Sequence, residues 1–244
     1  MRALSAAELL DVWEAGFAQA PTERALALLA AACPEFSLDA LAAIPIGQRD
    51  ARLLALRQGL WGPLMDVVAS CPSCRERIEL PLDVRQLLAD SQVTNWGELT
   101  GSFSELEVTF HVPTSREVRK GALEADAESG QNVIFRQCLL KAEKDGVAVD
   151  LDNLPQEVVE GIVSSMAEAD PLADIQLDLT CPSCAHRWHA VFDIVSFLWT
   201  EIEVWAWRIL SDVHTLARAY GWGEREILSL SPTRRQFYLE MVGA

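Results

Sequence analysis

The sequence predicts an α+β fold in which a split four-cysteine zinc ribbon joins mainly helical N- and C-terminal parts to an α/β insertion. Three observations support this prediction. The motif Cys-Pro-Ser-Cys occurs twice, from Cys71 to Cys74 and from Cys181 to Cys184, and each copy lies between two short runs typical of strands. Residues 1–62 and 194–244 carry apolar side chains at helical spacing. The stretch between the two motifs mixes strand and helix patterns.

The paired cysteines predict a metal site. A Cys-x-x-Cys turn places two sulfur atoms on one side of a tight bend, so two such turns that face each other supply four thiolates in the tetrahedral arrangement that Zn²⁺ prefers. The proline after each first cysteine fixes one backbone dihedral and suits a turn. We therefore expect one structural zinc ion, with these ligands: Cys71, Cys74, Cys181 and Cys184.

The spacing between the two motifs shows that such a ribbon must be split. The motifs are separated by 106 residues, whereas a compact ribbon has roughly 15 to 20. The predicted organisation is a helical part (1–62), a first hairpin with a short helix (63–100), an acidic α/β insertion (101–174), a second hairpin (175–193) and tryptophan-rich C-terminal helices (194–244). In this arrangement the metal would hold the two ends of the insertion together.

Other uses of the cysteines remain open alternatives. A redox dithiol of the thioredoxin type needs a helix that starts within the Cys-x-x-Cys turn, whereas strand-like residues follow both motifs. Disulfides in a secreted chain are a further alternative. His186 and His189 follow Cys184 closely, and either could replace a thiolate. Residues three apart on a strand face opposite directions, so both could not.

The N-terminal part reads as four helices. Ser5 and Glu8 have capping-box spacing before the first helix. Pro21 opens a second helix that Pro34 ends, a short third helix covers 38–43, and a fourth covers 50–60. After the first motif we expect a short helix over 82–88 and then a polar stretch through Asn95.

The insertion begins with a strand whose residues alternate between apolar and polar from 105 to 112. Helices are predicted over 115–123, 132–141 and 155–167, with a break at Ser129-Gly130. Residues 115–178 hold 14 Asp and Glu against 6 Lys and Arg. This excess predicts either a solvated helical surface or a docking face for a basic partner.

The C-terminal part contains the strongest helical pattern, from Val195 to Tyr220. Charged residues interrupt the pattern, so it does not predict a transmembrane span. Its apolar stripe is wide and must be enclosed by the chain's own fold or covered by another chain. Trp199, Trp205 and Trp207 are therefore candidate partner-binding residues, with burial inside the monomer as the alternative.

Composition narrows the classes of function. The formal net charge of −16 argues against general nucleic-acid binding and against an anionic membrane surface. Acidic residues interrupt the first helix, so we expect no targeting segment and a reducing, cytoplasmic location.

No catalytic motif is recognisable, so we expect no catalytic residue, no enzymatic activity and no small-molecule substrate. The rival function is a zinc-ribbon nucleic-acid-binding or regulatory module, for which Arg75, Arg77 and Arg187 would be the contacts.

Several stretches together resemble a known family. They are residues 44–57, Gly62-Pro63 before the first motif, Ala169-Asp-Pro171 before the second, and residues 220–238. They look like the tail baseplate proteins of T-even-like contractile phages and, more closely, like the baseplate hub assembly chaperone relatives encoded with phage-derived contractile injection systems. The resemblance implies a bacterial cytoplasmic protein that docks to other baseplate or tail proteins. It implies either assembly of a phage tail or injection particle, or incorporation into one.

Overall fold

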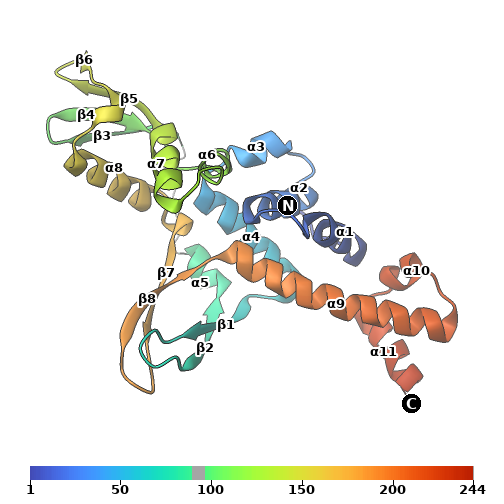
Figure 1. The fold of residues 1–244 in the computed structure, drawn as a ribbon. Coiled ribbons are helices and arrows are strands. Elements are labelled where there is room, and N and C mark those ends of the chain that lie inside the picture. Colours follow the sequence, from blue (N-terminus) through green and yellow to red (C-terminus); the bar gives the residue numbers. More distant parts are fainter. Residues whose placement is uncertain (90–96, 244) are drawn as a thin grey trace. The chain divides into compact units, whose positions relative to one another are not determined.

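The computed structural model describes residues 1–89 and 97–243 (Figure 1). The chain divides into two compact units. One unit comprises Met1–Glu35 together with the chain from Val195 onwards, and the other comprises Phe36–Ile194. Among the described residues helices predominate, and the strands form three small antiparallel sheets. The predicted mixture of helices and sheets is confirmed. The polar stretch expected through Asn95 lies partly outside the described residues.

The first unit is helical. Its elements are α1 (Ala6–Gly16), α2 (Pro21–Ala32), α9 (Ile194–Tyr220, from Val195 onwards), α10 (Glu224–Ser229) and α11 (Pro232–Gly243). The predicted capping box is present, because the Ser5 hydroxyl accepts a hydrogen bond from the Glu8 backbone N–H while the Glu8 carboxylate accepts from that of Ser5. Long α9 is the largest element of this unit.

One core cluster of the helical unit lies between α1, α9 and α10. Leu10 of α1 packs in one cluster with buried residues of α9 and α10, which are Ala206, Ile209, Val213, Leu216, Ile227 and Leu228. Gly16 allows α1 to approach α9 closely, because a Cβ atom there would lie 2.3 Å from the Trp199 ring.

The second unit contains the sheets. Its elements in chain order are α3 (Leu38–Ala42), α4 (Ile46–Trp61), β1 (Leu64–Ser70), β2 (Arg77–Asp83), α5 (Val84–Ala89), β3 (Leu99–Phe103), β4 (Leu106–Phe110), α6 (Ser115–Gly121), α7 (Ala127–Cys138), β5 (Leu139–Lys144), β6 (Val147–Ala148), η1 (Leu151–Asn153), α8 (Gln156–Ala169), η2 (Pro171–Ala173), β7 (Ile175–Thr180) and β8 (Arg187–Phe192).

The insertion forms a four-stranded sheet in the order β3-β4-β5-β6. The alternation predicted for its strand is confirmed, since Leu106, Val108 and Phe110 are buried while Glu107 is exposed. These side chains share a core with residues of α8, among them Ile162. The sheet and α8 therefore bury one face each against the other.

The helix predicted over 132–141 is displaced in the structure, where α7 covers Ala127–Cys138. It begins earlier because the Asp126 side chain caps it, and it runs through the expected break at Gly130. Gly121 and Gly130 touch backbone to backbone, since a Cβ on Gly121 would lie 2.7 Å from the Gly130 carbonyl oxygen. The glycine thus serves helix packing rather than a turn, and the chain after Cys138 continues as a strand.

Helix α4 is joined to the segment that precedes the second hairpin. The Gly47 backbone N–H donates to Asp170 Oδ2 at 2.8 Å, although the two residues are 123 apart in the sequence. Beyond this contact the chain enters β7 and β8. Within the described residues, no helix combines the length and apolar character that crossing a membrane requires.

Candidate metal centre

The two cysteine motifs form the turns of two antiparallel hairpins, β1–β2 and β7–β8 (Figure 1). Strand-like residues on both sides of each motif pair in register and bring the motif to the hairpin tip. The same backbone hydrogen bonds close both turns, with Cys71 N to Glu76 O at 2.9 Å, Arg75 N to Cys71 O at 2.8 Å, Cys181 N to His186 O at 2.9 Å and Ala185 N to Cys181 O at 2.9 Å. One local sequence therefore produces one local structure twice.

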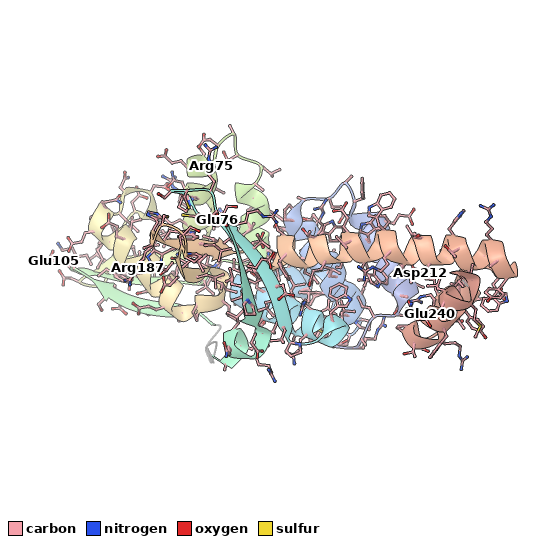
Figure 2. The ribbon with its side chains drawn as sticks, turned by 90° about the horizontal axis from the view of Figure 1, so that it is seen from below. Arg75, Glu76, Glu105, Arg187, Asp212 and Glu240 are labelled. Atoms are coloured by element: carbon pink, nitrogen blue, oxygen red, sulfur yellow. The ribbon has the colours of Figure 1, made fainter. Side chains whose placement is uncertain are left out.

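Both turns also share an unusual backbone conformation. The residue after the second cysteine has a positive φ, 64° at Arg75 and 57° at Ala185. Arg75 is labelled in Figure 2 beside Glu76 of the same turn. A non-glycine residue pays roughly 1–2 kcal/mol for this region. Both copies adopt this conformation although neither has a glycine at the position, so the rest of the turn holds the residue there.

The two turns bring four sulfur atoms together. Cys71 Sγ lies 3.7 Å from Cys184 Sγ, and Cys74 Sγ lies 3.5 Å from Cys181 Sγ. All four Sγ atoms lie within 4.8 Å of one another. A tetrahedral ion with Zn–S bonds of about 2.3 Å needs sulfur atoms about 3.8 Å apart. The donor set therefore has the dimensions and chemistry to hold one tetrahedral metal ion.

Each motif has one buried and one exposed cysteine. The first cysteine of each, Cys71 and Cys181, is buried, whereas the second, Cys74 and Cys184, is exposed. The cysteines all lie within the described residues, and none of them forms a disulfide there. Cys138 lies in the core of the insertion, where burial and then Glu117 raise its pKa to about 12. Cys33 is buried in the helical unit.

The thiols of the cluster influence one another's ionisation. Burial raises the pKa of Cys71, but hydrogen bonds from the backbone N–H groups of Cys74 and Ser73 and from neighbouring thiols outweigh it and lower the pKa to about 7. At Cys74 the Glu76 backbone N–H lowers the pKa, but Cys181, burial and the other thiols raise it to about 12. Thiolates this close repel one another, so a divalent cation is needed to hold four of them ionised.

The two histidines after the second motif do not join the cluster. His189 Nδ1 lies 2.5 Å from Asp178 Oδ1 on the neighbouring strand, and both side chains are exposed. His186 stacks on Trp188, with ring centroids 6.1 Å apart. Among the described residues, the group of close ligand atoms consists of the four cysteines. A pocket of about 400 Å³ at this hairpin is lined by residues of both strands, which are Asp178, Leu179, Thr180, Arg187, Trp188 and His189.

The three candidate partner-binding tryptophans differ in environment. Trp199 is buried, with the Arg24 guanidinium 4.6 Å from its ring centroid. Trp205 is half-buried against the core of the helical unit. Trp207 is 66% exposed and lies on the same helix as the exposed Val204. Of the three tryptophans, one is therefore buried, one half-buried and one exposed.

Sequence reasoning gave no role to Gly47 or Asp170, which the structure brings into contact. A Cβ on Gly47 would lie 2.0 Å from Asp170 Oδ1, so the carboxylate fills the space beside this glycine. Asp170 is only 5% exposed, and burial raises its pKa while Gly47 N–H and Arg49 lower it. Nearby Asp50 has its pKa raised to about 6 by burial, against the effect of Arg49. The available signal was that both residues lie in stretches that carry the family resemblance.

Comparison with known proteins identifies the family. The family described as T4 bacteriophage base plate protein matches residues 18–199, a range that includes both cysteine motifs and the Gly47–Asp170 contact. Neither the curated proteins nor the solved structures contain a match to the chain. The matched range covers well over half of the sequence, and the chain therefore belongs to the family of T4 bacteriophage base plate proteins.

Proposed function

We propose that this protein is a non-enzymatic component of the baseplate of a contractile phage tail or injection system, or an assembly chaperone of its hub, and that it acts by docking to other baseplate or tail proteins. Membership of the base plate family carries this proposal. The pattern of the described residues agrees with it, because the one group of close ligand atoms is a closed set of four thiols. Such a set leaves no open position for a substrate.

The metal in this proposal is one structural zinc ion bound by the four clustered cysteines. Four sulfur donors favour zinc over hard cations such as magnesium or calcium, which prefer oxygen. The ion connects two hairpin tips that the sequence places more than a hundred residues apart. Binding to the folded arrangement contributes directly to stability, because the unfolded chain does not present the four thiolates together.

Elemental analysis of freshly purified protein tests the metal. We expect about one zinc per chain, and a marked fall in melting temperature after treatment with a chelator. Cys181→Ser should abolish stoichiometric zinc, whereas Ser183→Ala in the same turn should retain it. Absence of metal together with thiols that cycle to a disulfide would replace the zinc proposal by a redox one.

Trp207 is the proposed docking residue of α9, supported by its exposure beside Val204. Trp199 and Trp205 would act by holding the helix in its unit. Large exposed apolar side chains at helical spacing are typical of association sites. We expect Trp207→Ala to weaken co-purification with tail particles at unchanged zinc content and melting temperature. Phe237→Ala, at a residue of α11 that is 59% exposed, is the matched control. Wild-type association of the Trp207 variant would remove α9 from the docking surface.

The two proposed roles, baseplate component and assembly chaperone, differ in whether the protein is present in the mature particle. A baseplate component remains in the mature particle, whereas a chaperone associates only with intermediates. Quantifying the protein in purified mature particles and in tail-assembly intermediates distinguishes them. Presence in the particle at a fixed copy number supports the component, and presence in intermediates alone supports the chaperone. Absence from both fractions contradicts the proposed function.

A further inference from the structure

A groove in the helical unit is separate from the metal centre and from the proposed docking residue Trp207. It lies between α1, α9 and α10 and encloses about 490 Å³. This volume is within the range of pockets that accept small ligands or side chains of a partner. Its lining residues are Leu10, Asp11, Trp13, Glu14, Phe17, Leu210 and Glu224.

The apolar part of the groove is aromatic and firmly held. The rings of Trp13 and Phe17 meet edge to face, with centroids 6.0 Å apart. Leu10 belongs to the buried core, and Trp13 and Leu210 pack against it. Phe17 is 61% exposed, so its ring is available to a ligand. The groove therefore rests on the core of the unit through Leu10, Trp13 and Leu210, and Phe17 of the turn after α1 lines its exposed side.

The polar part of the groove is acidic. Asp11, Glu14 and Glu224 are exposed, and no lysine, arginine or histidine is among the lining residues. In the described part of the chain these three carboxylates have no ion-pair or hydrogen-bond partner for their side chains. Arg24, by contrast, donates to the carbonyl groups of Gly16 and Phe17 and lies over a different ring. The groove therefore presents negative charge beside aromatic faces.

We propose that this groove binds a basic, arginine-bearing segment of a neighbouring tail protein, an inference that rests on the docking function proposed above. A guanidinium stacks on an aromatic face and pairs with carboxylates, and its alkyl stem covers apolar surface. Trp13 and Phe17 supply the faces, and Asp11, Glu14 and Glu224 supply the charges. An acidic segment would be repelled by the same rim.

The test is a titration of the full-length protein followed by NMR of the indole N–H groups. The probe is the acetylated, amidated tripeptide Leu-Arg-Leu, and the matched peptides carry Gln or Glu in place of Arg. The Trp13 resonance is assigned by its loss in Trp13→Phe. We expect a saturable shift of that resonance with the Arg peptide, at least about 5-fold weaker binding of the Gln peptide, and none of the Glu peptide.

Variants locate the binding in the groove. Asp11→Asn combined with Glu14→Gln should weaken the Arg peptide at least about 5-fold and reduce the sensitivity of binding to salt. Phe17→Ala should weaken it as well, through loss of the ring. Glu240→Gln, on α11 and outside the groove lining, should bind as wild type (Figure 2). No saturable shift with wild type, equal binding of the Glu peptide, or no effect of the double variant would overturn the proposal.

A measurement of association with tail particles distinguishes failure of the groove proposal from failure of the docking function on which it rests. The double variant is compared with wild type in co-sedimentation with tails. Loss of both peptide binding and tail association supports the groove as a docking site. Wild-type tail association despite lost peptide binding overturns the groove as that site and leaves the docking function standing. If wild-type protein binds the Arg peptide but no tail, the assignment to a tail protein is overturned.

Discussion

Replacing Asp170 by alanine should destabilise the unit formed by Phe36–Ile194, through the loss of one buried hydrogen bond. The carboxylate accepts from the Gly47 backbone N–H at 2.8 Å near the start of α4 and is almost completely buried. Without it, the N–H is left without this acceptor in a buried place, at a cost of about 1–3 kcal/mol. Deleting the side chain also leaves a void, because the carboxylate fills the space where a Gly47 side chain would be.

The sum of these effects is a loss of roughly 2–3 kcal/mol for Asp170→Ala. A unit change of 1 kcal/mol shifts the melting temperature of a domain of this size by roughly 2–4 °C, so we expect a fall of about 4–12 °C. Asp170→Asn should cost less than about 1 kcal/mol, because burial raises the pKa of Asp170 and an amide oxygen can still accept from Gly47. Gly47→Ala should disrupt the same contact, since the added Cβ would overlap the Asp170 carboxylate.

Two measurements check this prediction on zinc-loaded protein. Thermal unfolding by circular dichroism gives the overall loss, and hydrogen exchange of the peptide that contains Gly47 reports local opening at the start of α4. The local readout is needed because two units need not unfold as one. An alanine variant that loses less than about 0.5 kcal/mol and keeps its protection would refute the reasoning. Equal losses for asparagine and alanine would show that charge matters more than the hydrogen bond.

Three further predictions concern the turns, a buried carboxyl and the tryptophans. Arg75→Gly and Ala185→Gly should each stabilise the zinc-loaded protein by about 1 kcal/mol and raise its melting temperature, because both residues have a positive φ; lower melting temperatures would contradict this. Asp50 has a pKa of about 6 in the folded protein, raised by burial from 3.8. The folded protein therefore binds more protons at this carboxyl than the unfolded chain does, so the contribution of Asp50 to stability should fall as pH rises from 4 to above 6. Denaturant titrations of wild type and Asp50→Asn at each pH should diverge over that window by up to roughly 3 kcal/mol, and parallel curves would refute it. Trp199→Ala should cost about 3–5 kcal/mol because the ring is buried, whereas Trp207→Ala should change stability by less than about 0.5 kcal/mol, as calorimetry can check.

The sequence predicted the cysteine hairpins well because every determinant is local. Each motif contains its own turn residues, and the flanking strands pair with their immediate neighbours in the chain. The repeat of the motif, together with the chemistry of thiols, then indicated that the two tips meet. The four sulfur atoms do lie together in the structure, and the binding of zinc there stays a prediction.

The alternation from Leu106 to Phe110 likewise predicted one strand and its buried face correctly, because a period of two assigns each side chain to one face of a sheet. The first and last residues of the helices were predicted less accurately than this strand. The break expected at Gly130 was wrong because glycine at a close contact between two backbones has the same sequence appearance as glycine in a turn. Only the packing of α6 against α7 distinguishes the two uses.

The sequence by itself determined the two cysteine turns, the strand alternation, the N-terminal capping box and the resemblance to baseplate proteins, because these depend on residues close together in the chain or on shared motifs. Tertiary structure alone decided which tryptophans are covered, that Gly47 meets Asp170, and that α1, α9 and α10 form an acidic aromatic groove. The physical reason is that helical periodicity shows how side chains are distributed around a helix but not what covers each face. A contact between residues 123 positions apart leaves no periodic signal at either end.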